Sequence, residues 1–146
     1  MTEEPPTQLE LPDLNALDAN FAVDAVDAIL SLAIDVSASD VHLQPRGAGW
    51  EVLYRIDGVL SIGGFLAGGG PGDPVARLMV LAGLPTYRSG TPMEGRLVWG
   101  GDNQVERVSM RLGVFPTVHG PRGVVRILRR EGLHQKISLL GLEKKQ

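Results

Sequence analysis

Two spacings of apolar residues alternate along this chain of 146 residues. From Ala22 to about Val36 the apolar side chains recur every three or four positions, a spacing that places them on one face of a helix. These side chains are Val23, Val26, Ile29, Leu30, Ala33 and Ile34. Asp24 and Asp27 fall in the early turns, where negative charge suits the helix dipole. The segment is therefore predicted to form a helix.

A period of two follows this helix and predicts three strands. Val41 and Leu43 alternate with polar residues as far as Pro45, and a second alternating run covers residues 50–57. The Asp57-Gly58 pair is a tight-turn signal, after which residues 59–66 can return as the third strand.

A second helix is predicted after a glycine-rich loop at residues 67–73. Asp73 can cap this helix, and Pro74 suits the first helical position. Gly83 provides a stop, so the helix is expected over residues 74–82.

Strand-like patterns return in the second half, over residues 94–99, 105–112 and 123–128, with a loop from Pro116 to Pro121 before the last one. The order is therefore helix, three strands, helix, three strands. Such an order predicts an α+β fold, in which an antiparallel sheet of about six strands carries its helices on one face.

The chain length fits one domain with a hydrophobic core. Residues 1–20 combine prolines with acids and are predicted to form a flexible arm outside the core. The α+β domain is expected over residues 21–130. Residues 131–146 end in charged side chains and are predicted to form a linker-like tail.

Several function classes find no support in the composition. The chain contains no cysteine, which excludes disulfides and thiolate zinc sites. It has no signal-peptide pattern and no apolar run near the roughly 18 residues of a membrane span, so direct membrane insertion is not expected. A cytoplasmic protein is the expectation.

Charge is unevenly distributed, although the net charge is only −3. Residues 1–45 hold nine acids and no Lys or Arg, whereas eleven arginines occupy the remainder. Arginine favours bidentate contact with phosphate or carboxylate, which makes an anionic partner one interpretation. The alternative is that these arginines are ordinary solvated strand residues.

Catalytic motifs are missing. No glycine stretch forms the G-x-x-x-x-G-K-[ST] phosphate loop, and no G-x-S-x-G nucleophile elbow occurs. His42, His119 and His134 lie too far apart for the paired spacing of metal ligands. We therefore expect a non-enzymatic chain with neither cofactor nor metal.

Longer phrases of the sequence carry a more specific signal. In order along the chain they are AIDVSASDVHLQP from Ala33, YRIDGVL from Tyr54, RSGTPMEGR from Arg88, VSMRLGVFPT from Val108 and GPRGVVRIL from Gly120. In this order they resemble the amino-terminal domain of the GspE/PilB family of traffic ATPases, which drive type II secretion and type IV pilus assembly.

The resemblance implies a PAS-like fold that stands before a P-loop ATPase core and packs against it in a hexamer of the full-length protein. In the family, arginines of this domain face the nucleotide held by the core. Carried over to this sequence, Arg111 and Arg126 are the first candidates, with Arg96 and Arg55 behind them.

Other expectations follow from the same resemblance. The ATPase core would act in cis or in trans, and ATP and Mg²⁺ belong to that domain, which this chain lacks. The protein would be cytoplasmic, or held at the cytoplasmic face of the inner membrane by its partners. Ser39-Asp40 is interpreted as a helix-to-strand corner whose side chains cap backbone groups, and Asp57-Gly58 as a hairpin turn.

Two rival functions remain at this point. One is a stand-alone PAS-like module that binds a small molecule or a signalling partner. An enclosed apolar pocket of roughly 300 Å³ or more would favour it, while a basic face would favour the ATPase-associated domain. Nucleic-acid binding is the other rival and is not expected, because the chain is net acidic and its seven aromatic residues are not grouped.

Overall fold

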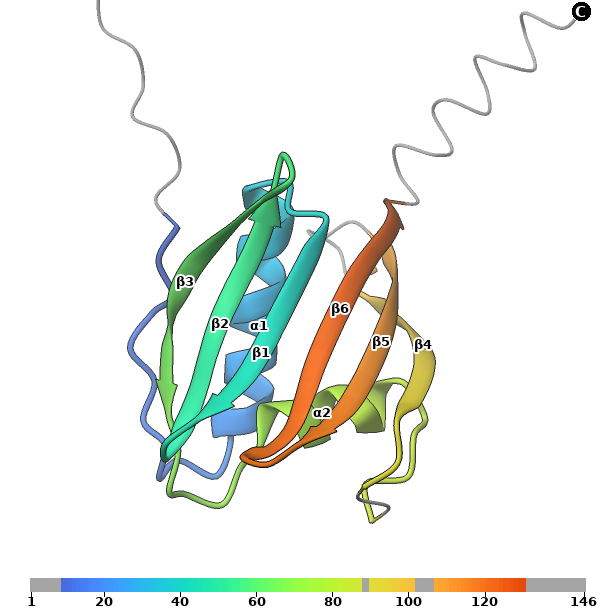
Figure 1. Cartoon of the computed structure of the whole chain (residues 1–146). Coiled ribbons are helices and arrows are strands. Elements are labelled where there is room, and N and C mark those ends of the chain that lie inside the picture. Colours follow the sequence, from blue (N-terminus) through green and yellow to red (C-terminus); the bar gives the residue numbers. More distant parts are fainter. Residues whose placement is uncertain (1–8, 88–89, 102–106, 131–146) are drawn as a thin grey trace, which may run out of the picture.

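A computed structural model describes residues 9–87, 90–101 and 107–130 of the chain. In this part, two helices and six strands follow one another as helix, three strands, helix, three strands (Figure 1). The first half comprises α1 (Phe21–Asp35), β1 (Asp40–Arg46), β2 (Gly49–Ile56) and β3 (Val59–Ala67). The second half comprises α2 (Pro74–Leu81), β4 (Met93–Trp99), β5 (Val108–Thr117) and β6 (Gly120–Arg130). The predicted α+β fold is confirmed.

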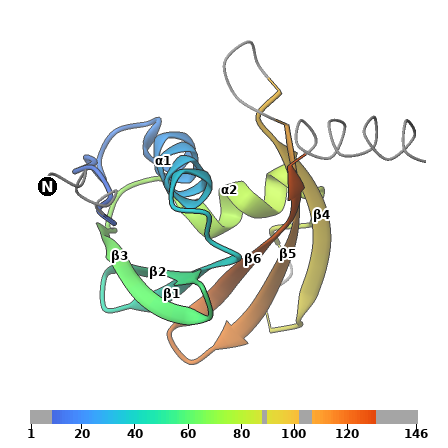
Figure 2. The ribbon, with the colours of Figure 1, turned by 90° about the horizontal axis from the view of Figure 1, so that it is seen from above.

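The six strands form one antiparallel sheet in the order β3-β2-β1-β6-β5-β4. The last strand therefore lies beside the first, at the centre of the sheet. Both helices lie on the same side, α1 behind the half that holds β1 to β3 and α2 across the half that holds β4 to β6 (Figures 1 and 2). The opposite face carries no helix in the described part of the chain.

The core fills the space between the helices and the sheet. Four of the apolar positions predicted to share one face of α1 are buried, namely Val26, Ile29, Leu30 and Ala33, whereas the predicted Val23 is exposed. Phe21 and Ala25 complete the buried face. Tyr54 reaches into this core from β2, where its hydroxyl donates a hydrogen bond of 2.8 Å to the carbonyl oxygen of Ile29. A Cβ atom on Gly63 would lie 2.3 Å from the Tyr54 ring, so β3 needs a glycine at this point.

Residues 9–16 run alongside the domain. The backbone N–H of Leu11 donates to the carbonyl oxygen of Gly63 at 3.2 Å, and Leu9, Leu11 and Leu14 pack against the core. This part of the segment predicted as an arm is thus in contact with the core. Residues 1–8 and the predicted tail at 131–146 lie outside the described residues, and the proposed domain boundaries stay predictions.

The prediction of a loop between Pro116 and Pro121 is wrong. β5 and β6 continue through this segment and are joined by a tight turn at Val118 and His119. Pro116 and Pro121 lie opposite each other, next to the pair Thr117 and Gly120 that closes the turn. Pairs at this position make no hydrogen bonds to each other in an antiparallel ladder, so the missing proline N–H groups cost the hairpin nothing. The predicted start of the strand at residue 105 lies outside the described residues.

Candidate functional site

One rung of the sheet brings together all four arginines that the sequence singled out. Arg55 on β2 lies opposite Asp40 on β1, and Asp40 lies opposite Arg126 on β6. Arg126 in turn lies opposite Arg111 on β5, and Arg111 opposite Arg96 on β4. Directly opposed residues in an antiparallel ladder project to the same face. These five side chains therefore form a continuous row across five strands, called here the arginine row.

The arginine row projects away from the helices. Each member is next in sequence to a residue whose side chain is buried on the helix side, and successive side chains of a strand point to opposite faces. These buried neighbours are Val41, Tyr54, Leu97, Leu112 and Val125. The side chains of Arg126 and Arg111 are 68% and 50% exposed. The row thus lies on the helix-free face, where a partner can reach it.

Asp40 is the buried member of the row, with 6% of its surface exposed. Its Oδ1 accepts a hydrogen bond of 3.1 Å from Nε of Arg126, and its Oδ2 lies 3.7 Å from Nε of Arg55. The Ser39 hydroxyl donates to the same Oδ2 at 2.8 Å. Sequence reasoning placed Ser39 and Asp40 in a backbone-capping corner and missed these contacts, because Arg126 is 86 residues away along the chain.

Electrostatics keep Asp40 ionised. Burial by itself raises the pKa of this carboxyl group, but the hydrogen bonds from Ser39 and Arg126 and the positive charge of Arg126 outweigh it. The pKa of Asp40 therefore lies below its ordinary value. A charged carboxylate thus stands between two guanidinium groups.

The other half of the row concentrates positive charge. Arg126, Arg111 and Arg96 lie on adjacent strands, with backbones about 5 Å apart from one strand to the next. Glu94 lies 3.7 Å from Arg111, but both side chains are exposed and the pair is weak. Like charges directly opposite one another destabilise a sheet. An anion bound across these three arginines would relieve the repulsion.

A second pair of charged or polar side chains lies on the same face. Nδ1 of His42 on β1 and Nη2 of Arg122 on β6 form a hydrogen bond of 2.7 Å, in which the guanidinium group donates. Burial and the nearby charge of Arg122 lower the pKa of His42, although Asp40 opposes this effect. His42 is therefore a neutral acceptor near pH 7, and Arg122 adds to the basic character of the face.

The turn expected at Asp57-Gly58 joins β2 to β3. Both residues have positive φ angles, 49° and 81°, between the paired residues Ile56 and Val59. Nη1 of Arg55 donates to the carbonyl oxygen of Gly58 at 3.1 Å. The turn thus helps to hold one end of the arginine row.

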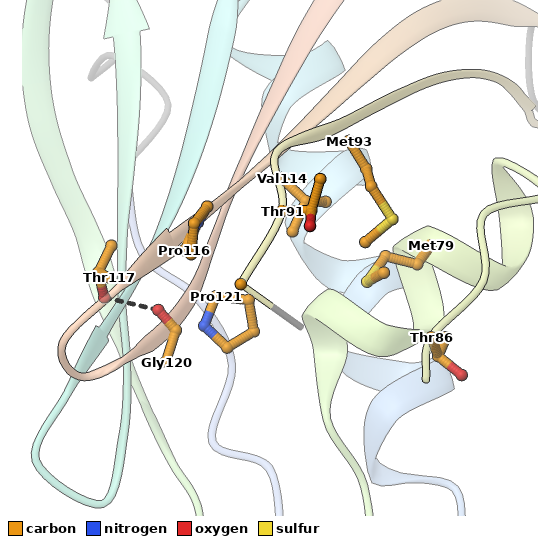
Figure 3. A pocket seen from close by; sticks show the side chains of 10 residues that line it. Met79, Thr86, Thr91, Met93, Val114, Pro116, Thr117, Gly120 and Pro121 are labelled. Atoms are coloured by element: carbon orange, nitrogen blue, oxygen red, sulfur yellow. Dashed lines mark hydrogen bonds between the residues drawn. The ribbon is translucent and has the colours of Figure 1, made fainter. Parts of the chain in front are cut away.

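An apolar pocket of about 210 Å³ lies between α2 and the β5–β6 hairpin. Figure 3 shows Met79 and Met93 on one side of it and Pro116 and Pro121 on the other. It lies on the helix side of the sheet and contains none of the arginines. Its volume falls short of the roughly 300 Å³ at which small-molecule pockets begin. A larger hollow of about 410 Å³ beside residues 10–13 is open and mostly polar, so neither space supports a stand-alone ligand-binding module.

In the part of the chain that the structure describes, no group of three or more His, Cys, Asp or Glu side chains could hold a metal ion. None of the described helices has the length and apolar character that a membrane crossing requires.

Comparison with known proteins gives a consistent set of matches. A family model described as type II/IV secretion system protein matches residues 15–146. The type IV pilus assembly ATPase TfpB of Acinetobacter baylyi is 34% identical over 92% of this chain and 23% of its own length. The type IV pilus assembly ATPase PilB of Thermus thermophilus is 30% identical over 90% of this chain and 15% of its own. The chain thus spans less than a quarter of these relatives.

A solved structure shows a related fold. The ATPase DotB of Legionella pneumophila superposes on 82% of this chain with a TM-score of 0.50 and 15% sequence identity, and the match covers 32% of the DotB chain.

Proposed function

Since the chain belongs to the type II/IV secretion system protein family, we propose that it is a non-catalytic domain that supplies arginines to the nucleotide bound by an ATPase core. Membership of this family confirms the resemblance to the GspE/PilB ATPases. The arginine row is the observation that carries the proposal. It places Arg126, Arg111 and Arg96 side by side on an accessible face.

The chemistry of the row suits phosphate. A guanidinium group is planar, stays charged at all physiological pH values and donates two parallel hydrogen bonds to phosphate oxygens. Fixed positive groups of this kind stabilise the charge that develops on a phosphoryl group during transfer. In this proposal the ATPase core holds ATP and Mg²⁺, and the present chain contributes charge and orientation only.

The surroundings of the row favour a protein partner. Leu60, Ile62 and Phe65 on β3 are 41%, 62% and 56% exposed. Leu60 lies opposite Arg55, at one end of the row. Protein interfaces are enriched in arginine and aromatic side chains. We propose that this face docks on the ATPase core, in the same polypeptide or in another one, within a hexamer of full-length subunits on the cytoplasmic side of the membrane.

A chimera tests the proposal. The matched segment of Acinetobacter TfpB is replaced by this chain, and ATP hydrolysis by the purified chimera is measured. Arginines that stabilise phosphoryl transfer contribute about 10³-fold or more to the rate. We therefore expect the double substitution R111A/R126A to lower the rate at saturating ATP by at least about a hundredfold.

Arg46 supplies the matched control. It is an exposed arginine on the same sheet, and it pairs with Glu51 at 2.7 Å outside the arginine row. The substitution R46A should leave the hydrolysis rate of the chimera within about twofold, because surface ion pairs contribute little. An R111A/R126A chimera as active as its parent would contradict the proposed function.

A further inference from the structure

A buried carboxylate is unexpected in a row of side chains proposed to bind an anion. Asp40 carries a negative charge and lies one strand away from Arg126. Judged by charge alone, it should repel phosphate and weaken binding. Yet Ser39, Arg126 and Arg55 all direct donors at this carboxylate. Its arrangement therefore calls for an explanation other than net charge.

The contact with Arg126 has a defined geometry. Asp40 accepts from Nε, the inner nitrogen of the guanidinium group. The two outer nitrogens, each with two N–H groups, are left for another acceptor. Arg126 is otherwise an exposed side chain on a long flexible stem, and an unanchored arginine loses rotamer freedom when it binds a ligand. A carboxylate that holds Nε removes part of this entropic cost in advance.

Arg55 is held differently from Arg126. Its Nε faces Asp40 at 3.7 Å, and its Nη1 donates to the Gly58 carbonyl oxygen at 3.1 Å. One contact is with β1 and the other with the β2–β3 turn, and together they hold the guanidinium group at the β2 end of the row. Arg55 thus supports Asp40 from the side opposite Arg126.

We propose that Asp40 is the positioning residue of the arginine row: it orients Arg126 for a phosphate group shared with Arg111 and Arg96. Arg55 and Ser39 hold Asp40 in place, and Arg55 is a support rather than a phosphate ligand. The inference rests on the proposed function and deepens it. Asp40 strengthens phosphate binding despite its charge, because the orientation of Arg126 outweighs the repulsion.

The two explanations, net charge and positioning, predict opposite changes in anion affinity for the substitution D40N. Removal of one negative charge beside the row should tighten anion binding if charge alone matters. D40N keeps an amide oxygen that can accept from Nε of Arg126, but it replaces a charge-assisted hydrogen bond by a weaker neutral one. This change should weaken binding if Asp40 orients that side chain. The sign of the change therefore separates the two explanations.

The test uses the 146-residue chain labelled with ¹⁵N, and inorganic tripolyphosphate as the probe at constant ionic strength. The Nε–Hε signals of the arginines report each guanidinium group. Without phosphate, the Arg126 signal of the wild-type chain should exchange slowly with water, and D40N should make it exchange at least about threefold faster. Titration should shift the Arg126 and Arg111 signals together and leave Arg55 nearly unchanged. We expect the dissociation constant of D40N to rise by at least about threefold.

Two further variants serve as controls. E51Q removes one carboxylate from the same face without touching the row, and it should bind tripolyphosphate as tightly as the wild type or slightly more tightly. S39A keeps the Asp40 carboxylate and removes its 2.8 Å hydrogen bond from the exposed Ser39, together with the 3.4 Å bond from the same hydroxyl to the Arg55 carbonyl oxygen. It should therefore change binding in the direction of D40N by a smaller factor. S39A keeps the test decisive if D40N proves too unstable to fold.

The outcomes distinguish failure of the proposed anion site from failure of the positioning role of Asp40. No phosphate-dependent shift at Arg126 or Arg111 in the wild-type chain would remove both the proposed anion site and the role of Asp40. A wild-type chain that binds, with D40N and S39A binding equally or more tightly, would overturn the positioning role and leave the anion site standing. A phosphate-induced shift of Arg55 as large as that of Arg111 would reject its assignment as a support.

Discussion

At the scale of single residues, His42 is a neutral side chain among the arginines of the helix-free face. His42 accepts a hydrogen bond from Arg122, and a proton on its Nδ1 would remove that acceptor. The groups that face it are Arg122 and Arg55, which disfavour a positive histidine, and Asp40, which favours one. Burial and Arg122 prevail and lower the pKa of His42.

This pKa shift makes stability depend on pH. The unfolded chain protonates His42 near the ordinary value of 6.5, whereas the folded chain does so only at lower pH. Between these values the unfolded state binds more protons, so the free energy of unfolding falls as the pH is lowered. Thermal unfolding between pH 7.5 and 5 should show this loss in the wild type and a smaller loss in H42Q.

His119 supplies the comparison for that experiment. It is exposed in the β5–β6 turn, and H119Q should keep the pH dependence of the wild type. Asp40 does not interfere in this pH range. Its contribution to the free energy of unfolding is lost mainly below its ordinary pKa of 3.8. Equal slopes for H42Q and the wild type would show that the His42–Arg122 contact does not govern this pH range.

At the scale of elements, the two helices begin in different ways. Asp73 caps α2, since its Oδ1 accepts from the backbone N–H groups of Val75 and Ala76 at 2.8 and 3.3 Å. Asn20 stands at the same position before α1, but its side chain makes no capping hydrogen bond. α1 is a longer helix with a broad buried face, so packing can stabilise it without a cap.

This difference predicts unequal effects of two similar substitutions. D73A should lower the free energy of unfolding by about 1 kcal/mol, because it leaves helix N–H groups unsatisfied. N20A should change it by less than about 0.5 kcal/mol, as expected for a surface position without such contacts. Urea denaturation of both variants measures the difference, and equal losses would mean that the Asp73 cap contributes nothing specific.

At the scale of the whole molecule, charge separates the two faces. Exposed Asp24, Asp27 and Asp35 lie along α1, whereas the arginine row lies on the far side of the sheet. A polarised charge distribution steers encounters with anionic partners, as the proposed docking of the basic face would require. This arrangement agrees with a domain that contributes charge to a site built by another domain.

The proposed function predicts that the isolated chain does not hydrolyse ATP. A phosphate-release assay at millimolar ATP and Mg²⁺ should give a rate indistinguishable from a buffer control, because the sequence contains no phosphate loop. The active chimera is the positive control for the same assay. Hydrolysis that scales with the concentration of the isolated chain would contradict the non-catalytic role.

Local patterns in the sequence were enough to predict the elements. The helix near residues 22–36, the Asp73 cap and the turn at Asp57-Gly58 all depend on residues within about four positions of one another. Predictions failed where a local signal had two interpretations. Pro116 and Pro121 suggested a loop, but in the sheet they occupy a pair that needs no N–H groups.

The sequence by itself determined the class of fold, the two repeats of a helix with three strands, and the arginines worth attention. Only the tertiary structure decided that β6 lies between β1 and β5, in a register that aligns Arg55, Asp40, Arg126, Arg111 and Arg96. The physical reason is distance along the chain. Strand order and register depend on packing between segments up to 86 residues apart, and no spacing within one segment encodes such contacts.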